Sequence, residues 1–176
     1  MRHRAIEEQL RGLVARVAPG ARIYFPRKRG WQVGTAYSWN GRHLRPTGLT
    51  LESQLHEIAH LLLAAPDRLD QVEFGLGPDP YRRYDVPRTI SKQAADLEEL
   101  HACWMQLLLT HLLELDVAAV CYEYQLEPLT PPMVAELHRT YPDALPADWW
   151  QRALERFAAD QGAHQSTHQG THQGTQ

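Results

Sequence analysis

The chain has 176 residues, of which 43% are hydrophobic, and this is enough for one folded domain with a sizeable core. Its formal net charge is −3, so the overall charge does not favour binding to nucleic acid or to an anionic membrane. The two cysteines, Cys103 and Cys121, lack the paired spacing of a thiolate metal site. The sequence shows neither a charged leader with an apolar run nor an apolar stretch of about 18 residues. We therefore expect a cytoplasmic protein with reduced thiols and no membrane span.

Apolar periodicity and turn residues predict a helix and then a small sheet in the early part of the chain. Apolar residues recur on one helical face over residues 4–18, and Pro19-Gly20 ends this helix. Short strands are expected over residues 21–26, 33–39 and 42–45. The last two flank Asn40-Gly41, a pair that favours a tight hairpin because both residues tolerate positive φ. The sequence therefore predicts a small antiparallel sheet.

The segment from Thr50 to Pro66 has the pattern of a buried or half-buried helix. Thr50 is a suitable N-cap, and Ala64-Ala65-Pro66 ends the segment. Leucine and isoleucine recur at helical spacing at Leu51, Leu55, Ile58 and Leu62. The C-terminal half is apolar on most sides, which an exposed helix would not be.

This helix carries the HExxH motif His56-Glu57-Ile58-Ala59-His60. Residues four apart lie on one face of a helix, so His56 and His60 can present two imidazole nitrogens to one metal ion. Glu57 lies about 100° around the helix, where it can act as a catalytic base on a metal-bound water without being a ligand. The alternative is a core helix with internally bonded histidines, which would require unusual compensation for three buried polar groups.

Helices are expected to dominate the second half of the chain. A short strand is predicted over residues 71–74, and four Gly and Pro residues make 75–80 a loop. Ser91 is a suitable N-cap for a long helix to about Leu115. Its core stripe is expected to consist of Leu97, Leu100, Trp104, Leu107, Leu108 and Leu112. Two further helices are predicted over residues 131–140 and 146–159.

These elements predict a single α+β domain over residues 1–160 that is mainly helical. Residues 161–176 form a repeat of His, Gln, Thr and Gly with almost no apolar side chain. Such a segment cannot bury enough surface to fold, so we expect a disordered tail. The histidines of this tail could chelate metal weakly, but we expect the metal site in the folded domain, at the HExxH motif.

Two imidazoles leave a metal ion in need of a third protein ligand. The metzincin extension requires a glycine and a histidine at positions that Leu63 and Pro66 occupy here, so the sequence excludes that class. A glutamate from a later helix is the thermolysin-like solution.

Glu99 is the preferred third ligand. It lies on the flank of the predicted apolar stripe, and Ala102 would allow the two helices to approach closely. Glu98, about 100° away around the helix, is an alternative that the sequence separates weakly. His101 is a further alternative, either as a third imidazole or as a group that orients the carboxylate.

The HExxH motif is followed by Ala64, Arg68, Val72-Glu73-Phe74-Gly75 and Pro78-Asp79. This spacing resembles the elongation factor P hydroxylase family, in which HEIxH precedes an Ala, an Arg and a Val-Asp-Phe-Gly run. Less sharply, Ile23-Tyr24-Phe25-Pro26 is similar to the N-terminal strand of that family, and Glu98-Glu99 to its acidic segment. The resemblance spans residues 21–158, and its specific part is 56–79.

The resemblance implies a zincin-like hydroxylase that uses oxygen and one Fe or Mn ion to modify a lysine-derived side chain on a translation factor. The chain departs from the family at Leu76-Gly77 and at Leu100-His101-Ala102. The resemblance therefore supports the same metal site more strongly than it supports the same substrate. Considered without the resemblance, two His and a carboxylate suit zinc equally well. A zinc-dependent peptidase or amidohydrolase with Glu57 as general base therefore stays an alternative, with a non-catalytic metal-binding protein as a third.

Overall fold

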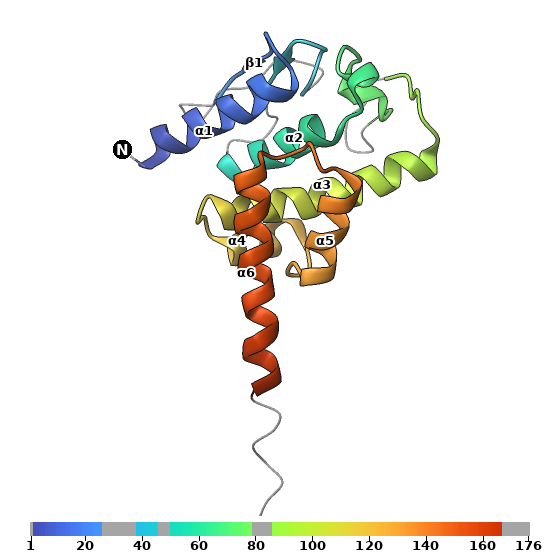
Figure 1. Cartoon of the computed structure of the whole chain (residues 1–176). Coiled ribbons are helices and arrows are strands. Elements are labelled where there is room, and N and C mark those ends of the chain that lie inside the picture. The colour runs from blue at the N-terminus through green and yellow to red at the C-terminus, as the bar shows by residue number, and fades with distance from the viewer. Residues whose placement is uncertain (1, 26–37, 46–49, 79–85, 167–176) are drawn as a thin grey trace, which may run out of the picture.

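The computed structural model describes residues 2–25, 38–45, 50–78 and 86–166. Within these ranges the protein is mainly helical, as predicted, and has one very small sheet (Figure 1). The elements are α1 (Arg2–Val17), β1 (Arg22–Ile23), β2 (His43–Leu44), α2 (Leu51–Leu63), η1 (Pro66–Arg68), η2 (Glu73–Gly75), α3 (Lys92–Leu112), α4 (Val117–Tyr124), α5 (Pro131–Thr140) and α6 (Ala147–Ser166).

Helix α2 lies between α1 and α3 and packs against both (Figure 1). Its start is capped by Thr50, whose side chain accepts a hydrogen bond from the Ser53 amide at 3.2 Å. It ends at Ala64, where the backbone becomes extended ahead of Pro66. Most of its side chains are buried, with the apolar ones forming part of the core. The predicted buried helix over this segment is confirmed.

Helix α3 begins at the predicted cap, because the Ser91 side chain accepts from the Ala94 amide at 3.1 Å. The predicted core stripe is wrong in its first half, since Leu97 is 52% exposed and Leu100 is 45% exposed. That half buries Glu98 and His101 instead, because both polar side chains have partners on neighbouring elements. In the second half Leu107 and Leu108 are fully buried, as expected.

The small sheet is parallel, so the prediction of an antiparallel sheet is wrong. β1 pairs with β2 through Arg22 opposite His43 and Ile23 opposite Leu44. The turn at Asn40-Gly41 does form, with Gly41 at φ 85° and with Asn40 Oδ1 accepting from the two amides after the turn.

Among the residues that the structure describes, this turn is followed by one antiparallel bridge, between Trp39 and Leu44. β1 occupies the other edge of β2 and runs in the same direction as β2. Most of the predicted strand 33–39 lies outside the described residues.

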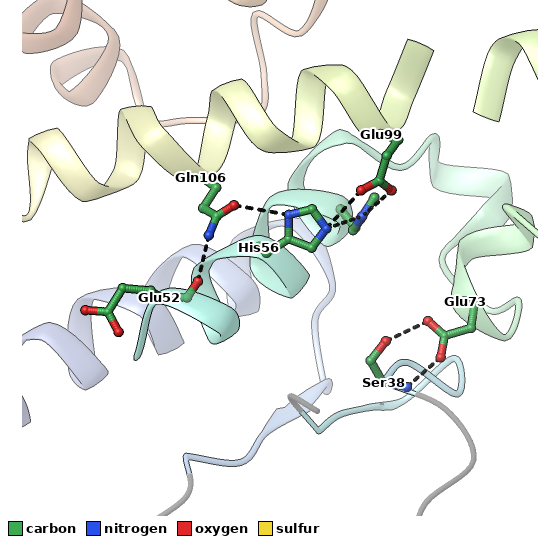
Figure 2. A network of polar contacts seen from close by, with 7 residues as sticks. Ser38, Glu52, His56, Glu73, Glu99 and Gln106 are labelled. Carbon is green, nitrogen blue, oxygen red and sulfur yellow. Dashed lines mark hydrogen bonds and ion pairs between the residues drawn. The ribbon is translucent and has the colours of Figure 1, made fainter. Parts of the chain in front are cut away.

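The strand predicted over residues 71–74 is a single bridge followed by a turn. Val72 bridges Asn40, and the next three residues, Glu73 to Gly75, have φ values of 48°, 55° and 69°. Left-handed backbone costs a non-glycine residue about 1–2 kcal/mol, so this turn requires outside support. Part of it comes from Ser38, whose amide and hydroxyl donate to the Glu73 carboxylate at 2.5 and 2.6 Å (Figure 2).

The remaining helices frame the other side of α3. Helix α4 was not predicted: Glu114, at φ 54°, follows the end of α3, and Asp116 caps a new helix by accepting from the Ala119 amide at 3.0 Å. The predicted bounds of α5 are confirmed, whereas α6 continues past the predicted end at residue 159 to Ser166. Tail residues 167–176 lie outside the described ranges. Among the described helices, none combines the length and the apolar character needed to span a bilayer.

Candidate metal centre

The two histidines of the HExxH motif lie one turn apart on α2 and face the same point. Their Nε2 atoms are 3.1 Å apart, and their ring centroids are 4.7 Å apart with the planes almost perpendicular. The His56 side chain is 18% exposed and the His60 side chain 7%. The helical geometry expected from the i, i+4 spacing is therefore present.

Glu99 of α3 closes this pair into a cluster of three donors (Figure 2). Its Oε1 lies 3.2 Å from His56 Nε2, and its Oε2 lies 3.2 Å from His60 Nε2. The Glu99 side chain is 54% exposed, so the cluster is buried on the histidine side and open on the glutamate side. The structure thus brings together the three residues that the sequence predicted as ligands. That they bind a metal ion stays a prediction.

The spacing of the two imidazole nitrogens fits a single ion, and the Glu99 carboxylate lies within reach of the same ion. Ligand atoms at about 2.1 Å from a divalent metal are separated from each other by roughly 3.0–3.4 Å in octahedral or tetrahedral sites. The two Nε2 atoms, 3.1 Å apart, are in this range, and each lies 3.2 Å from a different oxygen of Glu99. One ligand atom from each of the three residues lies within 4.8 Å of the others. Two imidazoles and one carboxylate also match the donor sets of zinc and non-haem iron enzymes. The residues therefore suit one ion with further coordination positions toward solvent.

Gln106, two turns after Glu99 on the same face of α3, orients the His56 ring. Its side-chain Oε1 lies 3.2 Å from His56 Nδ1, and its Nε2 donates to the Glu52 carbonyl at 3.0 Å (Figure 2). With its amide fixed in this way, Gln106 accepts from His56 Nδ1–H, so that the neutral ring would present its Nε2 lone pair to a metal ion. Sequence reasoning missed Gln106, although its position seven residues after Glu99 places it on the same helical face.

The charges of the cluster are strongly coupled. Burial acts to lower the pKa of His56, but hydrogen bonds with Cys103 and Glu99 and the charges of Glu99 and Glu57 raise it to about 10. Burial acts to raise the pKa of Glu99, whereas hydrogen bonds with both histidines hold it well below its usual range. Without a metal ion the cluster is therefore a protonated imidazole bonded to an ionised carboxylate. A divalent cation would take the place of the shared proton.

Aromatic rings pack on both imidazoles. Tyr124, the last residue of α4, stacks on His56 with ring centroids 6.1 Å apart and planes at 21°. Burial and the charge of Glu123 raise the pKa of Tyr124 to about 12, so its hydroxyl is protonated at neutral pH. Phe74 stacks on His60 at 6.1 Å and 22°. Neither contact was predicted from the sequence.

Glu57, the predicted catalytic residue, is buried at 9% exposure beside the cluster. Its charge contributes to the raised pKa of His56, which places its carboxylate within electrostatic range of the ligands. Position 57 is thus on the helix face next to the two histidines, as the motif requires.

The two alternative ligands do not join the cluster. Glu98 is buried and pairs with Arg68. His101 is also buried, and its Nδ1 lies 3.0 Å from the Tyr141 hydroxyl on the far side of α3 from the cluster's donors. The sequence could not separate these residues from Glu99, because positions 98, 99 and 101 of one helix differ only in direction and the direction depends on tertiary packing.

Comparison with protein-family models, with curated proteins and with solved structures finds no match. The geometry of these residues is therefore what supports a function.

Proposed function

We propose that this chain is a mononuclear metal-dependent enzyme in which His56, His60 and Glu99 hold one divalent ion. The observation that carries the proposal is the convergence of the two imidazole Nε2 atoms, 3.1 Å apart, on the Glu99 carboxylate, whose two oxygens each lie 3.2 Å from one of them. One ligand atom from each residue lies within 4.8 Å of the others, close enough to bind one ion together. Only two helices supply the donors, and both are anchored in the core on either side of the cluster.

The exposure of the cluster favours catalysis over a purely structural metal. Structural zinc sites are closed by four protein ligands, whereas catalytic sites keep positions for water and substrate. Here three residues converge and the side chain of Glu99 is about half exposed. Substrate can approach from that side, while the histidines are held from behind by Gln106 and the aromatic rings.

The activity we favour is oxygen-dependent hydroxylation of a lysine-derived side chain on a translation factor. The support is the resemblance of Ala64, Arg68, Phe74-Gly75 and Pro78-Asp79 to the elongation factor P hydroxylase family, which goes beyond the HExxH helix itself. The bound ion, Fe or Mn, would supply the redox chemistry. Glu57 would hold and transfer a proton beside it, and the open side near Glu99 would admit the protein substrate.

A second candidate is hydrolysis of a peptide or amide bond with zinc. The buried position of Glu57 next to His56 supports it, because a carboxylate there suits a general base for a metal-bound water. Zinc would supply Lewis acidity and lower the pKa of that water toward ~7. Both candidates share the ligands and differ in whether the ion must change its redox state.

Oxygen consumption distinguishes the two candidates. The Fe(II)-loaded chain should consume oxygen faster when a translation factor carrying the modified lysine is added, and zinc should inhibit, because zinc cannot change its redox state. The measurement is an oxygen-electrode trace with mass spectrometry of the substrate, and His60→Ala serves as control. Cleavage of a peptide or amide by the zinc-loaded chain under anaerobic conditions, without hydroxylation, would refute the hydroxylase and favour the hydrolase.

A further inference from the structure

A buried ion pair lies next to the candidate metal centre. Arg68, at the end of η1, pairs through Nη2 with Glu98 Oε2, and both side chains are 8% exposed. The other carboxylate oxygen, Glu98 Oε1, is buried without a hydrogen-bond partner in the described part of the chain. Arg68 is therefore the group that balances the Glu98 charge. A buried carboxylate that loses such a partner strongly disfavours the folded state.

Arg68 also holds the backbone of the left-handed turn η2. Its Nη1 donates to the Phe74 carbonyl at 2.8 Å. Phe74 is the middle residue of the turn, with φ 55° and ψ 19°, a conformation that non-glycine residues rarely adopt. A guanidinium is planar with donors in fixed directions, so one arginine can bind a carboxylate on α3 and a carbonyl in the turn together. The strained turn is thereby tied to the helix that carries Glu99.

The ring of Phe74 connects this turn to a predicted metal ligand. It is 1% exposed and stacks on Trp39 at 5.5 Å and on His60 at 6.1 Å. His56 is oriented by a hydrogen bond to Gln106, but His60 Nδ1 is buried and has no hydrogen-bond partner within the described ranges. Packing against Phe74 therefore supports the plane of the His60 ring, whose Nε2 contacts His56 and Glu99.

We propose that Arg68 and Glu98 form a clamp that positions the His60 imidazole through the Phe74 ring. The inference rests on the proposed metal centre and assigns positioning residues beside the same three ligands. It gives adjacent carboxylates on α3 separate roles: Glu99 points to the histidines, and Glu98 is neutralised by Arg68 and secures the turn. Removing the Arg68–Glu98 pair should leave all three ligands in the chain, but the His60 ring should be held less firmly in the orientation that binds the ion.

The test is the double variant Arg68→Met/Glu98→Met in the full chain. Replacing both members with apolar side chains avoids an unpaired buried charge, so the helical fold should persist. Zinc affinity, measured by competition with a chromophoric chelator, should fall roughly tenfold, in the range expected for loss of a group that supports a ligand. The ring-proton resonances of His60, which lie in the field of the Phe74 ring, should shift and broaden, and amide exchange should accelerate over residues 74–76.

Arg88→Met is the matched control, because exposed Arg88 binds the same loop through the Leu76 carbonyl at 2.9 Å and, in the described part of the chain, forms no hydrogen bond with Phe74 or Glu98. It should leave the zinc affinity and the His60 resonances unchanged. A double variant that folds, with wild-type zinc affinity and unshifted His60 resonances, would overturn the clamp. Failure of the wild-type chain to bind zinc would instead refute the metal centre, and the His60 resonances would still decide on the clamp.

Discussion

Replacing Glu99 with alanine is expected to weaken metal binding by roughly 100- to 1,000-fold, because a structural zinc site gains about 10–16 kcal/mol from four ligands and each 1.4 kcal/mol is tenfold in affinity. The Glu99 side chain is 54% exposed, so its truncation leaves no cavity, but it removes the carboxylate that pairs with the largely buried His56. The loss should appear in a metal titration, and the unfolding midpoint of the metal-free chain should also fall at neutral pH. The raised pKa of His56 and the lowered pKa of Glu99 mean that their pairing stabilises the folded state there.

Glu98→Gln is the matched control on the neighbouring position. The amide keeps the shape of the side chain and an oxygen that can accept from Arg68, so metal affinity should stay within about tenfold of the wild-type value. The buried Arg68 loses its counter-charge, so the unfolding midpoint should fall in this variant. The reverse result, with severe loss in Glu98→Gln and little in Glu99→Ala, would move the third ligand to Glu98. Mild and equal effects of the two variants on metal affinity would favour His101 as the third ligand.

Glu57→Gln is expected to retain the metal ion and to lower turnover by about 10²–10⁴-fold. The amide has nearly the same shape as the carboxylate but cannot accept a proton, so the step that needs a base fails while the three ligands stay in place. Turnover is measured with the substrate that the wild-type chain processes, beside metal content of the same sample.

Glu52→Gln is the control for this variant, since Glu52 lies near the start of the same helix and contacts the cluster only through its backbone carbonyl and Gln106. It should retain both metal and turnover. Loss of the metal ion in Glu57→Gln would make Glu57 a structural residue and remove its catalytic role.

Local sequence signals were sufficient for the helix that carries the histidines. Thr50, the HExxH spacing and Ala64-Ala65-Pro66 act within one helix, and the structure caps and ends α2 at these residues. The preference for Glu99 came from its place beside an apolar stripe, and the structure does place Glu99 at the His pair. The predicted apolar stripe is wrong in its first half, because Leu97 and Leu100 are exposed.

The features that sequence missed depend on contacts between distant segments. The direction of the sheet is set by β1 reaching the free edge of β2, which the Asn40-Gly41 turn cannot encode. Glu98 is buried because Arg68 reaches it from η1, and a glutamate in an isolated helix gives no sign of this. Gln106 and Phe74 acquire their roles only when α2, α3 and the turn come together.

The metal content of the chain tests the central claim most directly. The tail histidines His164, His168 and His172 are first replaced by asparagine, and the protein is purified without a metal-affinity column, so that any bound ion belongs to the domain. Elemental analysis should find about one divalent ion per chain, and His60→Ala in the same background should lose it, because two remaining donors cannot hold a catalytic ion. A chain that binds no ion, or one that keeps its ion after His60→Ala, would contradict a centre built from His56, His60 and Glu99.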